Sequence, residues 1–191
     1  MNAVLHHTGA FVTNAANMLT LARIAAAPVL FSLVLSHEAT LGASWAAALL
    51  GLAMAVTDKI DGMLARSHGG TRAGAFLDPL ADKVVVLGGM ACLYIVGSYA
   101  LIPVVIVWVR ELAVSLWRFK WAGRGVAIPA RTSAKYKTFV QGLALLFAIT
   151  PGLVDQRWLV QSSLWLAVAL TVSTGAQYLV DGRTHLPPDP V

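Results

Sequence analysis

The chain has 191 residues, of which 58% are hydrophobic and only 12% are charged. Soluble globular domains carry about 25% charged residues, so this composition excludes most soluble enzymes, and the single cysteine, Cys92, excludes a disulfide-stapled domain. The fold class that remains is an all-α polytopic membrane protein. A span takes about 20 residues, so the length allows roughly six transmembrane helices.

Six apolar runs are predicted to be the transmembrane helices, and they follow a short N-terminal amphipathic segment over residues 1–17. The runs cover residues 19–36, 45–57, 84–96, 101–117, 139–149 and 158–180. Residues 1–185 are expected to form a single domain. The proline-rich tail, residues 186–191, is expected to be disordered.

The formal net charge of +5 is unevenly distributed over the connections between these runs. The second and fourth connections are basic, and they contain Lys59, Arg66, Arg72, Arg118, Lys120, Arg124, Arg131, Lys135 and Lys137. The first and third connections have no Lys or Arg, and the fifth has only Arg157. Cytoplasmic loops collect Lys and Arg, so the pattern predicts both termini in the cytoplasm.

Two pairs of aspartates flank the second connection. Asp58 and Asp61 are three residues apart, and Asp78 and Asp82 are four apart, so each pair shares one face of a helix. Residues 67–73 form a short connection, which predicts that the two helices are antiparallel neighbours. The four carboxylates are therefore expected to converge near the cytoplasmic interface.

Such a cluster is unfavourable in a membrane, where each central Asp costs roughly 2.5–3.5 kcal/mol, unless cations neutralise it. Mg²⁺ is held by carboxylates together with substrate phosphates, and two such ions suit displacement at phosphorus. Gly62 and Gly74 allow a ligand to approach closely, and Arg66 presents a guanidinium suited to a diphosphate. A solvated boundary position explains a single Asp better than it explains four.

The pattern resembles the signature of the CDP-alcohol phosphatidyltransferase family, D-x2-D-G-x2-A-R, then seven or eight residues, then G-x3-D-x3-D. Every fixed position is present: Asp58, Asp61, Gly62, Ala65, Arg66, Gly74, Asp78 and Asp82. The resemblance extends to residues 17–23, to Arg110 and Glu111, and to residues 135–138.

This resemblance implies two divalent ions, Mg²⁺ or Mn²⁺, as cofactors. Their ligands would be Asp58, Asp61, Asp78 and Asp82, and Asp82 would also be the catalytic general base. The CDP-lipid would contact Asn17, Thr20, Gly62, Arg66, Thr71 and Gly74. Members of the family share six spans and are commonly homodimers, which implies a multi-pass enzyme of the bacterial inner membrane with its active site facing the cytoplasm.

Residues 77–83 resemble the phosphatidylglycerophosphate synthase branch, which transfers the phosphatidyl group of CDP-diacylglycerol to glycerol 3-phosphate. Cations for the acceptor phosphate would be Arg110, Arg118, Lys135 and Lys137. Anchoring to anionic lipid headgroups is the alternative for Arg118, and pairing with Glu111 is the alternative for Arg110. Ala134 stands where this branch usually has glycine, so a cardiolipin synthase using phosphatidylglycerol is the alternative function.

A cation or proton transporter is an alternative of a different class, because intramembrane acids also mark such proteins. Transport predicts acids near the middle of the membrane and an inverted repeat, whereas these acids lie at one rim. The basic loops contain no nucleic-acid-binding motif, so no nucleic-acid partner is expected.

Overall fold

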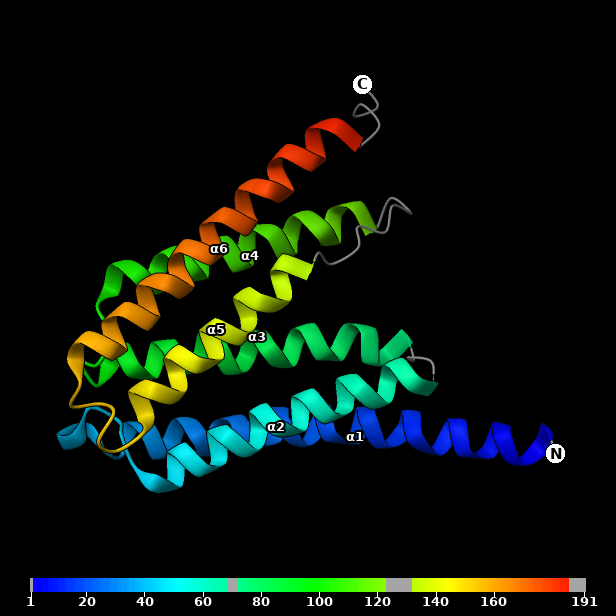
Figure 1. Ribbon diagram of the computed structural model, residues 1–191, viewed down its shortest axis with the longest axis horizontal. Helices are drawn as coiled ribbons and strands as arrows, with labels where there is room; N and C mark the ends of the chain where they lie inside the picture. The colour runs from blue at the N-terminus through cyan, green and yellow to red at the C-terminus, as the bar shows by residue number, and fades with distance from the viewer. Residues whose placement is uncertain (1, 69–71, 123–131, 186–191) are drawn as a thin grey trace.

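The computed structural model describes residues 2–68, 72–122 and 132–185, and this part of the chain is entirely helical apart from short turns. Its α-helices are α1 (Asn2–Leu35), α2 (Trp45–His68), α3 (Arg72–Ile95), α4 (Leu101–Ala122), α5 (Thr132–Ile149) and α6 (Arg157–His185), with a 3-10 turn, η1 (Glu38–Thr40), after α1. The helices run up and down as an elongated bundle (Figure 1). The all-α prediction is confirmed. The tail over residues 186–191 lies outside the described residues.

One boundary prediction is wrong, and another is confirmed. Residues 2–17 are not a separate amphipathic segment, because the backbone of α1 continues through them without a break. The prediction that Asp58 and Asp61 lie on a helix is confirmed, since α2 extends to His68. The helix α3 begins at Arg72. Pro79 therefore lies in the helix interior, where it has no N–H to donate to the preceding turn.

Local sequence signals explain where several helices begin and end. Ser44 precedes α2, and its Oγ accepts a hydrogen bond from the backbone N–H of Ala47 at 3.1 Å, as an N-cap residue does. Gly97 follows α3 with φ of +77°, a left-handed conformation that glycine adopts without strain. The N–H of Ser98 then bonds back to the carbonyl of Leu93 at 2.9 Å, which closes the last turn.

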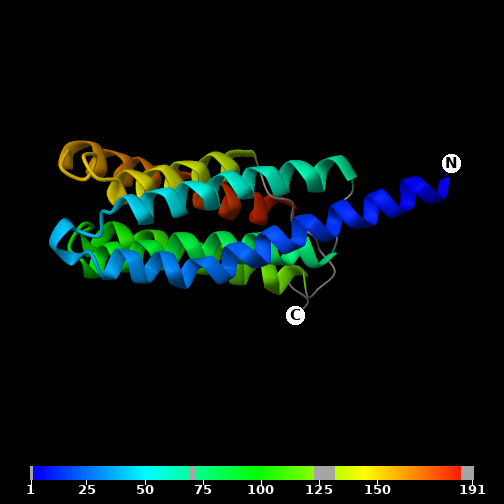
Figure 2. The same ribbon diagram turned by 90° about the horizontal axis from the view of Figure 1, so that it is seen from below.

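The six helices form two groups of three. In the first group α1 packs against both α2 and α3, and in the second α6 packs against both α4 and α5. The groups meet where α3 contacts α4 and α5, and where α2 contacts α5. Among the described residues α2 and α3 make little direct contact. The helices α2 and α3, which were predicted to be neighbours, are therefore joined mainly through α1. Figure 2 shows α1 running along the bundle and projecting beyond it.

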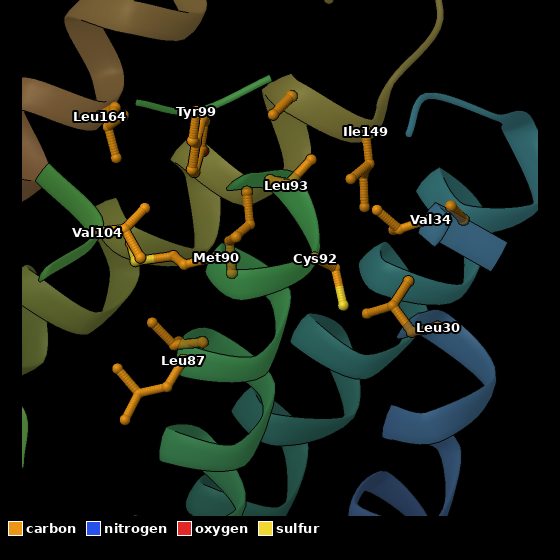
Figure 3. Close-up of a cluster of buried hydrophobic side chains, with 14 of the residues drawn as sticks. Leu30, Val34, Leu87, Met90, Cys92, Leu93, Tyr99, Val104, Ile149 and Leu164 are labelled. Atoms are coloured by element: carbon orange, nitrogen blue, oxygen red, sulfur yellow. The ribbon is translucent and has the colours of Figure 1, made fainter. Parts of the chain in front are cut away.

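The hydrophobic core fills one end of the bundle. Figure 3 shows Met90 and Leu93 of α3 at its centre, with Leu30 and Val34 of α1 on one side. Close helix packing accompanies this core. The ring of Phe31 on α1 lies directly against Gly88 on α3, where a Cβ would overlap it.

Buried polar side chains fill the other end. On α1, α2, α4, α5 and α6 these side chains lie farther than the core residues from the α1–α2, α3–α4 and α5–α6 turns. They are Thr20, Arg23, Asp61, Glu111, Lys137, Gln141, Thr171 and Thr174, whereas the buried Ser98 lies at the turn end, between α3 and α4. The bundle interior is therefore divided along its length into an apolar half and a polar half.

The outside of the bundle carries many large apolar side chains, among them Trp45, Leu49, Ile102, Leu116, Phe119 and Trp158. Among the described residues, two segments are long and apolar enough to cross a membrane, Asn17–Leu35 and Arg157–Tyr178. A third apolar segment, Tyr136–Ile149, is shorter.

Candidate active site

Three helices bring the four predicted aspartates into one acidic cluster in the polar half of the bundle. Asp58 and Asp61 come from α2, and Asp78 and Asp82 come from α3. Thr20 on α1 connects the two pairs. Its Oγ1 donates a hydrogen bond to Asp78 Oδ1 at 2.7 Å and lies 3.4 Å from Asp61 Oδ2.

Arg23, one turn after Thr20 on α1, forms the second connection. Its guanidinium donates to Asp58 and Asp61 on α2, and Nη1 lies 3.4 Å from Oδ1 of Asp82 on α3. These contacts and those of Thr20 together include all four aspartates. The expected convergence of the four side chains is therefore present, and α1 is the helix that produces it.

Exposure differs sharply within the acidic cluster. The side chain of Asp61 is 3% exposed, whereas those of Asp58 and Asp82 are 45% and 36% exposed. Asp61 thus lies at the inner end of the cluster, and the more exposed pair forms its accessible side. A charged or polar ligand can reach these two carboxylates without entering the core.

Carboxylate and hydroxyl oxygens are the donors that Mg²⁺ and Mn²⁺ prefer, so the chemistry of this donor set fits hard divalent ions. The carboxylates of the acidic cluster do not form a complete coordination sphere for a metal ion in this structure. Within residues 17–63, 77–121 and 136–178, no three acidic, His or Cys side chains are arranged to hold a metal ion as they stand. Three of the carboxylates instead contact the guanidinium of Arg23.

A second polar group, the Glu111 cluster, lies among α4, α5 and α6. Glu111 Oε1 accepts hydrogen bonds from Lys137 Nζ and, at 2.9 Å, from Arg110 Nη1. Arg110 Nη2 donates to Thr174 Oγ1 at 3.0 Å, and the guanidinium carbon lies 5.9 Å from the centre of the Tyr178 ring. One buried carboxylate therefore holds two cations in fixed positions.

Gly175 gives Arg110 the room for this position. A Cβ built on Gly175 would lie 3.2 Å from both Cγ and Nε of Arg110, closer than ordinary van der Waals contact. The arginine side chain therefore lies directly on the backbone of α6.

One pocket joins the acidic cluster to the Glu111 cluster. Its polar lining comes from α3, α4 and α5 and consists of Asp82, Lys83, Glu111, Lys137, Thr138 and Gln141. Gln141 is held in place by a hydrogen bond from its Nε2 to Thr171 Oγ1 at 2.9 Å. The pocket thus has a carboxylate of the acidic cluster and a cation of the Glu111 cluster on its walls.

Residues 13–173 match the sequence pattern of the CDP-alcohol phosphatidyltransferases, and this stretch contains the whole acidic cluster and the entire lining of the pocket. The chain belongs to the CDP-alcohol phosphatidyltransferase family. Membership confirms the resemblance drawn from the signature residues, and it gives no support to the transporter alternative.

Relatives within this family share most of their length with the chain. It is 36% identical over 174 residues to a probable phosphatidylglycerophosphate synthase of Mycobacterium tuberculosis, covering 88% of this chain and 81% of the relative. It is 35% identical over 182 residues to the CDP-diacylglycerol–glycerol-3-phosphate 3-phosphatidyltransferase of Bacillus subtilis, covering 86% and 93%. A protein of that name from Shigella flexneri is 31% identical over 179 residues, covering 91% and 97%.

The structure describes the other expected residues of a CDP-alcohol phosphatidyltransferase site to different extents. Asn17 lies on α1 one turn before Thr20, and Gly62 follows Asp61 on α2; both are partly buried. Arg66, Gly74 and Lys135 are described only as parts of the helical backbone, and Thr71 lies outside the described residues. Arg118 lies two turns beyond Arg110 on α4 and is partly buried.

Sequence reasoning missed the central position of two residues. From the sequence, Arg23 is included in the segment over residues 17–23 that resembles the family but is given no role of its own, although its spacing of three from Thr20 indicates a shared polar face. Glu111 was considered only as a partner of Arg110, and that pairing is present. Its bond to Lys137, 26 residues away, has no local sequence signal.

Proposed function

We propose that this chain transfers the phosphatidyl group of CDP-diacylglycerol to glycerol 3-phosphate, which yields phosphatidylglycerophosphate and CMP. The observation that carries the proposal is the pocket in which Asp82 and Lys137 line one space. A phosphorylated alcohol needs a base for its hydroxyl and cations for its phosphate, and we assign these roles to Asp82 and Lys137. The names of the relatives agree with this reaction.

The acidic cluster is the proposed site for two divalent ions, Mg²⁺ or Mn²⁺. The ligands would be Asp58, Asp61, Asp78 and Asp82. Ions bound there would neutralise the diphosphate of the donor, which otherwise repels an oxygen nucleophile. The proposed contacts of the CDP-lipid are Asn17, Thr20, Gly62, Arg66, Thr71 and Gly74.

Asp82 is the proposed general base, since it belongs to the acidic cluster and also lines the pocket. In the reaction, the acceptor hydroxyl oxygen forms a bond to the phosphatidyl phosphorus, the bond from that phosphorus to the CMP oxygen breaks, and the hydroxyl proton moves to the Asp82 carboxylate. A carboxylate within hydrogen-bond reach of the hydroxyl performs this step.

The acceptor phosphate is proposed to bind the cations of the pocket. Lys137 and Lys83 line the pocket, and Glu111 holds Lys137 and, next to the pocket lining, Arg110. Arg118 and Lys135 are the further candidates from the same ends of α4 and α5. Charge-assisted hydrogen bonds from such groups are about twice as strong as neutral ones, which suits a dianionic phosphomonoester.

The membrane arrangement is part of the proposal. The apolar exterior and the basic connections support our proposal of six spans with both termini in the cytoplasm. The acidic cluster would then face the cytoplasmic side of the bacterial inner membrane, where a lipid donor and a water-soluble acceptor meet. We also propose that the protein is a homodimer surrounded by membrane lipids.

An acceptor panel tests the function directly. Purified protein in detergent is given CDP-diacylglycerol, a divalent ion and, in turn, glycerol 3-phosphate, phosphatidylglycerol, inositol phosphate or serine, and the products are identified by mass spectrometry. We expect CMP and phosphatidylglycerophosphate with glycerol 3-phosphate alone, and no product with EDTA. Reaction only with phosphatidylglycerol would instead establish the cardiolipin synthase alternative.

Two variants complete this experiment. Asp82→Asn should abolish turnover because it removes the proposed base and one ligand of the ions. Asp155→Asn is the matched control, since Asp155 is an exposed aspartate in the turn between α5 and α6, at the opposite end of the bundle. Near-normal turnover by Asp82→Asn would refute the role given to Asp82.

A further inference from the structure

Arg23 enters the acidic cluster from α1, and its side chain is only 3% exposed. Nη1 donates to Asp58 Oδ1 and lies 3.4 Å from Asp82 Oδ1, while Nη2 donates to Asp61 Oδ2. The guanidinium therefore uses oxygen atoms of three of the four carboxylates to which the proposed function assigns the metal ions.

The ion-free protein needs a positive charge at this place. Asp61 is almost fully buried, and a buried carboxylate without a partner is strongly destabilising. A guanidinium is permanently charged and less strongly hydrated than an ammonium group, so it suits buried ion pairs. Among the described residues, Nε of Arg23 is buried without a hydrogen-bond partner. The carboxylates therefore hold the guanidinium through its two terminal nitrogens.

We propose that Arg23 is the internal counter-ion of the acidic cluster, which stabilises the protein while divalent ions are absent and competes with those ions for Asp58 and Asp61. The inference rests on the metal-binding role proposed above. A divalent ion and a guanidinium repel each other at short range, and both require the same carboxylate oxygens. Ion binding therefore requires Arg23 to give up part of its contacts.

Mn²⁺ binding to the purified full-length protein, followed by electron paramagnetic resonance without CDP-lipid, tests this competition. We expect Arg23→Gln to bind Mn²⁺ on the order of tenfold more tightly than the wild type, because a like charge has been removed. In EDTA the same variant should unfold at a lower temperature than the wild type, and saturating Mn²⁺ should reduce this difference.

Lys59→Gln is the matched control, because Lys59 is an exposed cation next to Asp58 on α2. It should change the Mn²⁺ affinity far less than Arg23→Gln does, since it removes charge without vacating the cluster. Equal effects of the two substitutions would show that only overall charge matters, and they would overturn the proposal.

Arg23→Lys keeps the test decisive if Arg23→Gln does not fold. Lysine retains the positive charge but lacks the planar guanidinium that pairs with several carboxylates at once. Arg23→Lys should therefore bind Mn²⁺ more tightly than the wild type does. Wild-type or weaker Mn²⁺ affinity in every folded Arg23 variant overturns the inference alone. Absence of Mn²⁺ binding by the wild type, or binding that Asp61→Asn leaves unchanged, overturns the proposed metal site and this inference with it.

Discussion

Lys137 and Glu111 lie 26 residues apart on different helices, and they form an ion pair in which both side chains are less than 10% exposed. Glu111 also accepts a bond from Arg110, so it is the common partner of two cations. Water is largely excluded from this pair, and each charge depends on its protein partners.

Glu111→Gln should therefore lower the free energy of unfolding substantially. The substitution keeps the shape of the side chain but leaves two buried cations without their anion, and breaking a buried pair in this way costs about 3 kcal/mol or more. Unfolding in detergent, followed by circular dichroism, measures the effect. Glu38→Gln is the control, because Glu38 is exposed in the turn after α1; equal stability of the two variants would contradict the prediction.

Thr20→Val should reduce turnover by about tenfold. The hydroxyl of Thr20 donates to the Asp78 carboxylate at 2.7 Å, and a hydrogen bond to a charged group contributes about 1.5–3 kcal/mol. The change preserves side-chain shape, and Thr20→Ser should restore most of the activity.

Thr57→Val provides the control for that series, since the Thr57 hydroxyl donates to the carbonyls of Ala53 and Met54 within its own helix. Steady-state release of CMP is the measurement. Full activity of Thr20→Val would show that the link between α1 and Asp78 has no part in turnover.

Gly175→Ala should raise the KM for glycerol 3-phosphate by about threefold or more, because small misplacements of a binding group are costly. The added Cβ would meet Cγ and Nε of Arg110 at 3.2 Å, so the guanidinium must shift from its place beside Glu111. The KM for CDP-diacylglycerol should change less.

Gly142→Ala is the control on α5, where an added Cβ would have no heavy atom within 4 Å among its described surroundings. It should leave both KM values unchanged and stabilise the helix by about 0.5–1 kcal/mol. If Gly175→Ala behaved in the same way, Arg110 would not be the group that binds the acceptor phosphate.

The sequence predicts the fold well where a physical signal is local. Apolar runs locate all six helices, and Ser44 and Gly97 mark two of their boundaries. The first helix is longer than expected because residues 2–17 contain no proline and only one glycine, so nothing there ends a helix. The role of α1 as the link between α2 and α3 has no such signal, since it depends on packing.

The sequence also predicts those parts of the site that depend on the local spacing of residues. Spacings of three and four residues place each aspartate pair on one helix face, and the pairs do meet. Arg23 was missed because an arginine near the start of an apolar run usually anchors a span at the membrane surface. Lys137 stays a proposed ligand of the acceptor phosphate, but its pairing with Glu111 has no local sequence signal because only the tertiary fold creates that contact.

The division of the interior into an apolar half and a polar half affects how this enzyme can be engineered. Core substitutions at Leu93 act about three helical turns along α3 from Asp82, and Leu93 is not among the residues that line the pocket. Heat tolerance and substrate choice can therefore be selected in separate mutant libraries and then combined, since distant substitutions are additive.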